Sequence, residues 1–284
     1  MELLERYNLV LQSAETETIE RLNKIIDASF NRLIRRVYVH LRTIGKENIA
    51  LRNVLILQEL RQLIPAARPG KVGKYEKLFQ TLYIRATTLG VDAASQLSMQ
   101  AGLVPPEGGV GTAIPIEAVK AAIEQTRTLL TKRSLEFANK ASDLIAQGIL
   151  EGRDIATTTN DVRTALNTTR SAASTIVRTE TLRAYNSASN SYYIQNNIKE
   201  VMWYATADSR TCKFCAPRAG KIYAIGSVSA PLHPRCRCYL APWNSELIKE
   251  NSNYNKSRLK HAKEVRFAED SAEILNVPGI LISI

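Results

Sequence analysis

The sequence predicts an α+β fold that is mainly α-helical, with a long helical N-terminal arm, a helical body and a small β-rich metal-knuckle module near the C-terminal end. Over most of the first 200 positions apolar residues recur at three- and four-residue spacing, which is the period of an amphipathic helix. Short runs of β-branched and aromatic residues begin at about position 200. All four cysteines fall between 212 and 238, in a module whose own apolar core would be marginal.

The N-terminal region, residues 1–101, is predicted to be helical. Within 1–63 the apolar residues Ile19, Leu22 and Ile26 belong to a stripe that also includes Ile25 and Phe30. We interpret this stripe as packing surface. Prolines and glycines between positions 65 and 73 break the pattern before a predicted helix at 74–101.

A loop rich in glycine and proline, residues 102–115, is the predicted linker between the N-terminal region and the body. It lacks the Gly-Lys-Ser/Thr ending of a phosphate-binding loop. Within the helical sequence that follows, Thr157–Asn160 offers a turn and Asp161 a helix cap. The helical part of the body, 116–199, comprises predicted helices at 116–150, 154–167 and 169–198.

The β-rich module, residues 200–243, is predicted from two strand-like runs, Val201–Tyr204 and Gly220–Ile225. The last segment, residues 244–284, contains a polar helix at 244–272 and an apolar tail that starts at Val277. We expect the tail to pack on this protein or to add a strand to a neighbour.

The composition indicates a soluble protein with a polyanionic neighbour. The 284 residues include 38 basic and 27 acidic side chains, a net charge of +11. No apolar run approaches the roughly 18 residues of a membrane span. The N-terminus has no basic region followed by an apolar stretch, so we expect cytosolic synthesis. In a reducing cytosol, clustered cysteines favour a metal site over disulfides.

The spacing of the cysteines predicts a structural Zn²⁺ site. Cys212 and Cys215 are separated by two residues, as are His233 and Cys236. Two such turns supply three sulfurs and one nitrogen, which suits a closed tetrahedral site. Cys238 is the alternate ligand, in place of either His233 or Cys236. A cluster of reduced thiols packed without metal is the other interpretation.

An ordered series of motifs over about residues 120–243 resembles the head morphogenesis domain of the phage Mu F-like and SPP1-type minor head proteins. The residues that carry the resemblance are Arg178-Thr179-Glu180 and Asn186, Trp203, Asp208 followed by Cys212 and Cys215, Gly220, and His233 to Cys238 ending at Pro242. The resemblance implies a structural minor head protein of a tailed bacteriophage that associates with the portal protein and other head proteins. It implies a role in head assembly, DNA packaging or DNA delivery, with multiple copies in the virion near the portal vertex. It places the chain in the host cytoplasm during assembly.

Arg178 and Glu180 are interpreted as architectural, with no catalytic role. Arg178 and Asn186 are predicted to form a polar network against the β-rich module. A buried arginine needs a carboxylate, for which Glu180 and Glu200 are the candidates.

Two other functions were weighed against a structural role. A zinc-supported nucleic-acid binder would place basic residues beside the aromatic residues Trp203 and Tyr204. These candidate DNA contacts are Arg210, Lys213, Arg218, Lys221, Arg235 and Arg237. A metal-assisted enzyme or transferase fits less well, because the three histidines, His40, His233 and His261, form no recognisable catalytic arrangement. No catalytic residue is therefore assigned.

Overall fold

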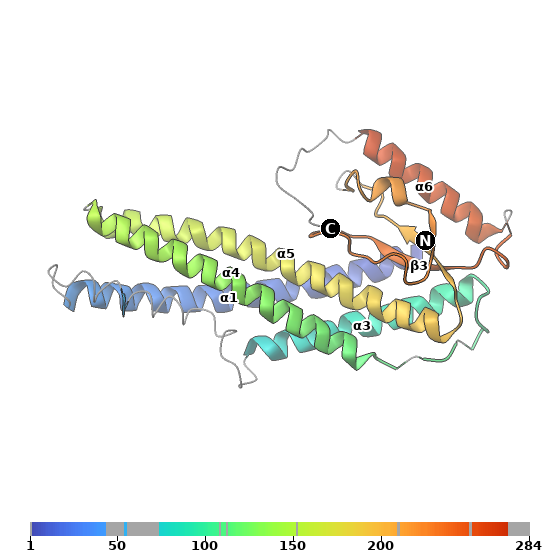
Figure 1. Cartoon of the computed structure of the whole chain (residues 1–284), viewed down its shortest axis with the longest axis horizontal. Coiled ribbons are helices and arrows are strands. Elements are labelled where there is room, and N and C mark those ends of the chain that lie inside the picture. Colours follow the sequence, from blue (N-terminus) through green and yellow to red (C-terminus); the bar gives the residue numbers. More distant parts are fainter. Residues whose placement is uncertain are drawn as a thin grey trace. The chain divides into compact units, whose positions relative to one another are not determined.

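The computed structural model describes residues 2–43, 54–55, 74–107, 109–111, 113–151, 153–208, 211–249 and 252–271. The predicted class is confirmed, since the protein is mainly helical with a small antiparallel sheet near its C-terminal end (Figure 1). Its elements are the helices α1 (Glu2–Thr43), α3 (Lys74–Gln100), α4 (Ile116–Leu150), α5 (Ile155–Gln195) and α6 (Asn253–Ser271), the strands β1 (Glu200–Tyr204), β2 (Ile222–Ala224) and β3 (Tyr239–Trp243), and the short 3₁₀ helix η3 (Ala216–Arg218).

Some predictions fall on parts of the chain that are not described. The expected continuation of the N-terminal helices after residue 43 falls almost wholly outside the described residues, and the prolines and glycines at 65–73 and the apolar tail from Val277 lie outside them entirely. Among the helices that are described, none is both long and apolar enough to cross a membrane.

The chain forms two compact units. Unit 1 contains residues 1–8, 87–115 and 185–284, and unit 2 contains residues 9–86 and 116–184. The helices α1, α3 and α5 are continuous and contribute residues to both units. Each unit combines segments that are distant in the sequence. The five consecutive regions predicted along the chain describe the order of its parts, and they stay a prediction.

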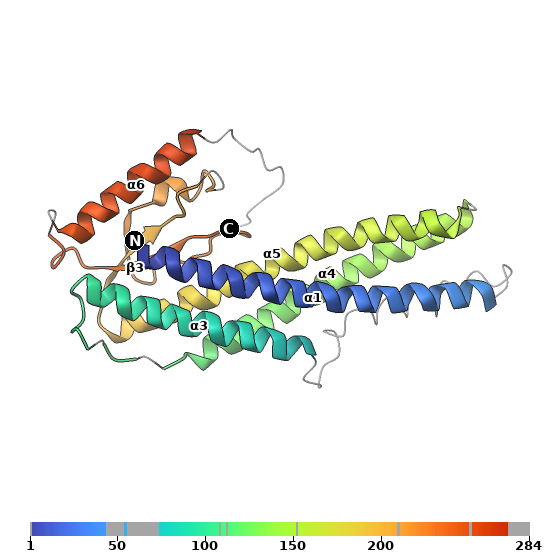
Figure 2. The same ribbon diagram turned by 180° about the vertical axis from the view of Figure 1, so that it is seen from behind.

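Unit 2 is a helical bundle, in which α4 and α5 lie side by side in both views (Figures 1 and 2). The predicted stripe on α1 is its contribution to the core, with Leu22 and Ile26 fully buried. Phe137 of α4 and Val177 of α5 are buried as well. Burial of these faces is the main source of stability for helices of this kind.

The predicted break between two helices near residue 168 is wrong, because α5 runs unbroken from Ile155 to Gln195. Threonine hydroxyls near this position donate to the carbonyl four residues earlier within the helix, as Thr164 does to Asn160 at 3.0 Å. The N-terminal cap is Asp154, which accepts from the Thr157 N–H at 2.8 Å, and not Asp161.

Unit 1 contains the three-stranded antiparallel sheet, in the order β2-β1-β3. The strands β1 and β2 correspond to the two predicted runs, whereas β3 was not predicted. Pro242 obscured it, since proline is rare in strands. The proline is tolerated because β3 lies at the edge of the sheet, where Pro242 pairs with Val201.

The helix α6 packs against the module in the same unit. Its Val265 joins the buried cluster that contains Trp203. Gly220 has φ +73°, and a Cβ there would lie 2.9 Å from the Ala262 Cβ, so this close approach requires glycine. His261 is also buried and stacks on Tyr204 with ring centroids 4.1 Å apart. This histidine is therefore a packed residue of the core.

Candidate metal centre

The first half of the centre is a tight turn that leads into η3. The backbone N–H groups of Cys215 and Ala216 both donate to the Cys212 carbonyl, at 2.9 and 3.0 Å. These bonds bring the two thiols of the Cys-x-x-Cys motif to the same side of the turn, as the spacing predicted.

The second half is a matching turn at His233–Cys236. The Cys236 N–H donates to the His233 carbonyl at 3.1 Å. Arg235, the residue before Cys236, has φ +63°, a left-handed conformation that tightens the turn. The structure therefore builds two similar turns from two segments that are 18 residues or more apart.

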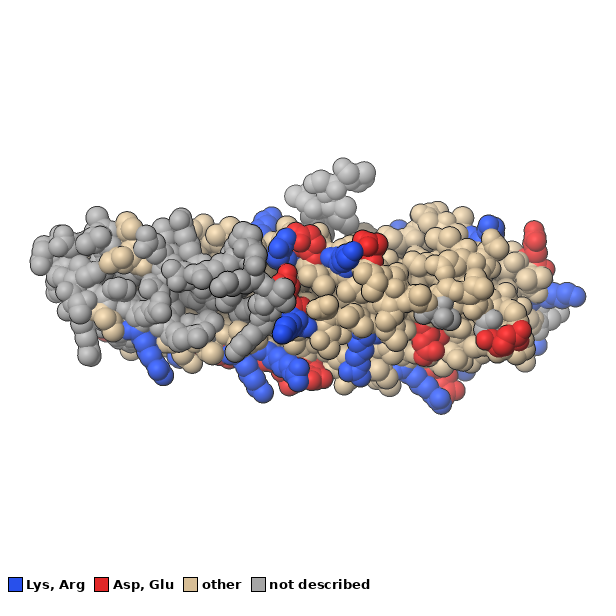
Figure 3. All heavy atoms as spheres, turned by 90° about the horizontal axis from the view of Figure 1, so that it is seen from below, with Lys and Arg blue, Asp and Glu red and all other residues tan. Residues whose placement is uncertain are grey.

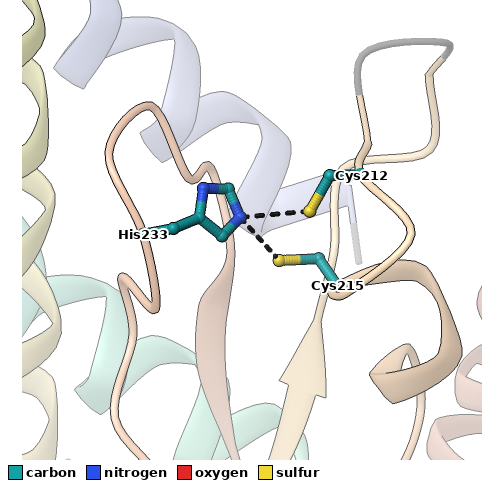
Figure 4. Close-up of side chains that lie close together, drawn as sticks. All are labelled: Cys212, Cys215 and His233. Carbon is teal, nitrogen blue, oxygen red and sulfur yellow. Dashed lines mark hydrogen bonds between the residues drawn. The ribbon is translucent and has the colours of Figure 1, made fainter. Parts of the chain in front are cut away.

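The two turns bring their side chains together (Figure 4). The Nε2 of His233 lies 3.1 Å from the Cys212 Sγ and 3.2 Å from the Cys215 Sγ, and the Sγ atoms of Cys215 and Cys236 are 3.8 Å apart. Sulfur ligands about 2.3 Å from a tetrahedral metal lie about 3.8 Å from one another. The spacing of the cluster thus suits a metal of zinc's size.

Five side chains, not four, surround the centre. Their ligand atoms form two groups, each within 4.8 Å: Cys212, Cys215 and His233, and Cys215, Cys236 and Cys238. Cys215 belongs to both groups. Cys238 and Cys236 are buried, whereas Cys212 and His233 are partly exposed. The five residues could hold a metal, and both fourth ligands considered from the sequence lie within the cluster.

The thiols and the imidazole of the cluster form hydrogen bonds with one another. Hydrogen bonding with Cys215 lowers the pKa of Cys212, and bonding with Cys212 and Cys236 raises the pKa of Cys215. Hydrogen bonding to Cys212 raises the pKa of His233 to about 10. A metal needs thiolates and a neutral imidazole, so its binding releases these protons.

An ion pair braces the two halves. The guanidinium of Arg237, between Cys236 and Cys238, donates to both carboxylate oxygens of Asp208 at 2.6 and 2.5 Å. The Thr206 hydroxyl donates to the Arg237 carbonyl at 3.1 Å. Asp208 is four residues before Cys212, so this bidentate pair ties the segment that enters the first turn to the segment that leaves the second. Its carboxylate raises the pKa of Arg237.

Asn186 of α5 fixes the edge of β3 beside the cluster. Its amide donates to the Cys238 carbonyl at 3.2 Å and accepts from the Leu240 N–H at 3.1 Å. Tyr193, seven residues along the same helix, donates to the Leu240 carbonyl at 3.1 Å. The helix therefore satisfies backbone groups that an edge strand would otherwise leave unpaired.

The remaining motif residues have different partners from those predicted. The predicted pairing of Arg178 with Glu180 is wrong: Arg178 is exposed and its charge acts on Glu15, while buried Glu180 accepts from Arg183 at 2.6 Å. The network expected between Arg178 and Asn186 is replaced by the contacts of Asn186 with β3. Glu200 instead accepts from the Ser245 N–H at 2.6 Å.

The proposed nucleic-acid face also differs in its aromatic residues. Trp203 and Tyr204 are buried, so neither can stack on a base. Among the basic candidates, Lys213, Lys221 and Arg235 are exposed, Arg218 and Arg237 are partly exposed, and Arg210 lies outside the described residues. Figure 3 shows one face of the protein, on which basic side chains are interspersed with acidic ones.

Two contributors were missed from the sequence. Tyr193 could have been found, because seven residues place it on the same helix face as Asn186. The exposure of Phe214 could not have been predicted, because it depends on how the rest of the chain folds around the turn that carries this residue.

Comparison with known proteins matches the same region. Residues 139–241 match the family model described as Phage Mu protein F like protein. No match is found among curated proteins or among solved structures. Since phage head proteins of this family are structural, the similarity points away from an enzyme. The matched region contains all of α5, the strands β1 and β2, the first residues of β3 and the Cys/His cluster. It is thus similar to the phage Mu F-like family, a family of phage head morphogenesis proteins, as the ordered motifs predicted.

Proposed function

We propose that this chain is a structural minor head protein of a tailed bacteriophage. It associates with the portal protein and other head proteins in multiple copies, and it acts in head assembly, DNA packaging or DNA delivery. The observation that carries the proposal is the family match at 139–241, which covers α5 and the whole Cys/His cluster. The protein works in the virion near the portal vertex, and in the host cytoplasm during assembly.

Particle composition and portal binding test this role. Mass spectrometry of purified virions should detect the chain, and a tagged portal protein from the same phage should retain it through purification. A phage that lacks the gene should give fewer filled or infectious heads, restored by expression in trans. Absence from purified heads would contradict the structural role, whereas presence without portal retention would contradict only the portal contact.

The Cys/His cluster is proposed to hold one structural Zn²⁺. Cys212, Cys215, His233 and Cys236 are the proposed ligands, and Cys238 is the alternate. Three thiols and an imidazole are the donor set that closed zinc sites use, and the 3.8 Å separation of the Cys215 and Cys236 sulfurs supports it. Cys215, Cys236 and Cys238 are buried, and Cys212 and His233 are partly exposed, which suits a structural site.

Elemental analysis of the protein purified without added zinc tests this site. About one zinc per chain is expected, and Cys215→Ser should remove it, because Cys215 belongs to both groups of three. His233→Ala and Cys238→Ala separate the fourth ligands: the true ligand lowers zinc content or affinity, while the other leaves it unchanged. Ser227→Ala, in the loop between the two turns, is the matched control. A metal-free wild-type protein with an intact fold would show a packed thiol cluster instead.

A further inference from the structure

The turn between the first two cysteines carries an exposed aromatic ring. Phe214 is 55% exposed, whereas Trp203 and Tyr204, the aromatic residues of the neighbouring strand, are 0% and 3% exposed. A module with so little apolar material would gain stability by burying this ring. At the surface the ring is available to a partner.

The backbone under the ring is fixed. Phe214 lies directly before Cys215, in the turn closed by the bond from the Cys215 N–H to the Cys212 carbonyl. The guanidinium of Arg218 donates to the Phe214 carbonyl. A ring presented on so short a hydrogen-bonded turn loses little conformational entropy when it binds, which favours recognition.

The segment of the chain that carries the ring is strongly basic. From Thr206 to Cys238 the sequence has six basic residues and one acidic residue, Asp208. That carboxylate is already paired with Arg237. The Lys213 Nζ lies 5.7 Å from the Phe214 ring centroid, so a cation accompanies the ring itself. We name Lys213, Phe214 and Arg218 the aromatic tip.

We infer that the aromatic tip binds single-stranded nucleic acid, with Phe214 stacking on an unpaired base and Lys213 and Arg218 contacting the phosphates beside it. An aromatic ring flanked by cations is the combination that single-strand binders use. The faces of a base inside a duplex are covered by its neighbours, so duplex DNA would engage the cations alone. The inference replaces the buried Trp203 and Tyr204 with Phe214 as the stacking residue. It extends the proposed function without needing portal association.

Fluorescence anisotropy with the full-length protein tests this. The probes are a labelled oligothymidylate of about 20 nucleotides and a duplex of equal length, in about 0.15 M salt. Wild type should prefer the single strand. Phe214→Ala should weaken single-strand binding by about 5- to 100-fold, the range found for one stacked base. Phe214→Trp should bind at least as tightly as wild type, and Phe214→Leu should behave like the alanine variant.

Matched controls separate stacking from other effects. Leu247→Ala removes a side chain that is 61% exposed in the same unit, and should leave binding unchanged. Lys213→Gln with Arg218→Gln should reduce the dependence of log affinity on log salt by up to about two, with the preference for single strands kept. Zinc content measured on every sample shows whether the turn is intact. If Phe214→Ala loses zinc, the test of stacking is the comparison of single-strand affinity between Phe214→Leu and Phe214→Trp.

Three results would overturn the inference. One is equal single-strand affinity in wild type and Phe214→Leu when both hold zinc. Another is equal binding of duplex and single strand by wild type. The third is a Phe214→Ala protein that keeps its nucleic-acid affinity and loses portal retention, which would make the tip a protein contact. None of these outcomes removes the zinc site or the presence of the chain in heads, so the failure of either proposal is distinguishable.

Discussion

At the scale of single residues, the centre depends on side chains that are not metal ligands. The pair formed by Asp208 and Arg237 holds the two ligand segments in register, and its half-buried position strengthens it relative to a surface pair. Residues that orient ligands without touching the metal commonly control how long it stays bound. Arg237 is thereby occupied, so the exposed Lys213 is the better phosphate contact.

Asp208→Asn should therefore release zinc faster than wild type. The variant keeps the shape of the side chain but turns a charged bidentate pair into a weaker neutral contact, at a cost of about 1–3 kcal/mol. The rate of zinc transfer to a colorimetric chelator measures the effect. Glu246→Gln, an exposed change in the same unit, is the control, and equal release rates in all three proteins would contradict the bracing role.

Glu15 gives unit 2 a pH dependence of its own. This carboxyl is buried in the bundle, and burial raises its pKa from 4.5 to about 8. In the unfolded chain it ionises near pH 4.5, whereas in the folded bundle it keeps its proton up to about pH 8. Its contribution is therefore fully present below pH 4.5 and is lost as the pH rises through 8, by on the order of 4 kcal/mol.

Glu15→Gln should remove this loss, because the amide has the shape of the protonated carboxyl and does not titrate. Denaturant unfolding followed by far-UV circular dichroism at pH 5 and pH 8 measures it. The free energy of unfolding should fall more between these values in wild type than in the variant. An equal fall in both proteins would show that Glu15 is not buried in the way described.

At the scale of elements, α5 and β3 depend on each other. A strand that contains proline at a sheet edge has few ladder bonds, and here helix side chains supply the missing partners. Tyr254, at the start of α6, adds a bond to the Pro242 carbonyl at 3.1 Å. The edge is thus closed to pairing with another chain on the side that faces α5.

Asn186→Ala should destabilise the sheet and the metal centre together. It leaves the Cys238 carbonyl and the Leu240 N–H buried without their partner, which costs about 2–4 kcal/mol for the two groups. The tryptophan fluorescence transition in urea reports the loss, with faster zinc release as a second readout. Ser187→Ala, at the next and exposed position of α5, should change neither.

These elements mark what the sequence could and could not predict. Helical periodicity predicts the buried face of α1, and local spacing predicts the two turns at Cys212–Cys215 and His233–Cys236, whereas the contact between the two turns is tertiary. The continuity of α5 depends on side-chain hydrogen bonds within the helix, such as that of Thr164, which a threonine can form equally well in a turn. The existence of β3 depends on partners that are far away in the sequence, such as Asn186. Exposure of Phe214 and burial of Trp203 are likewise tertiary, and both decide which residue meets a partner.

At the scale of the whole molecule, the two units should differ in what they need for stability. Unit 2 is held by apolar helix faces and contains the titrating Glu15, whereas unit 1 contains a small sheet beside the proposed metal. The two tryptophans of the chain, Trp203 and Trp243, both lie in unit 1. Tryptophan fluorescence therefore reports unit 1, while far-UV circular dichroism is dominated by the helices.

Removal of zinc should consequently lower the thermal transition seen by fluorescence more than the transition seen by circular dichroism. Units of unequal stability open separately when the contacts that are lost belong to one of them. A melt with and without a strong chelator, using both probes on one sample, measures the difference, and Cys215→Ser should melt like the chelated wild type. Equal shifts with both probes would mean that the continuous helices α1, α3 and α5 transmit the loss and make the two units one cooperative structure. An unchanged fluorescence transition would instead mean that the metal does not contribute to the stability of unit 1.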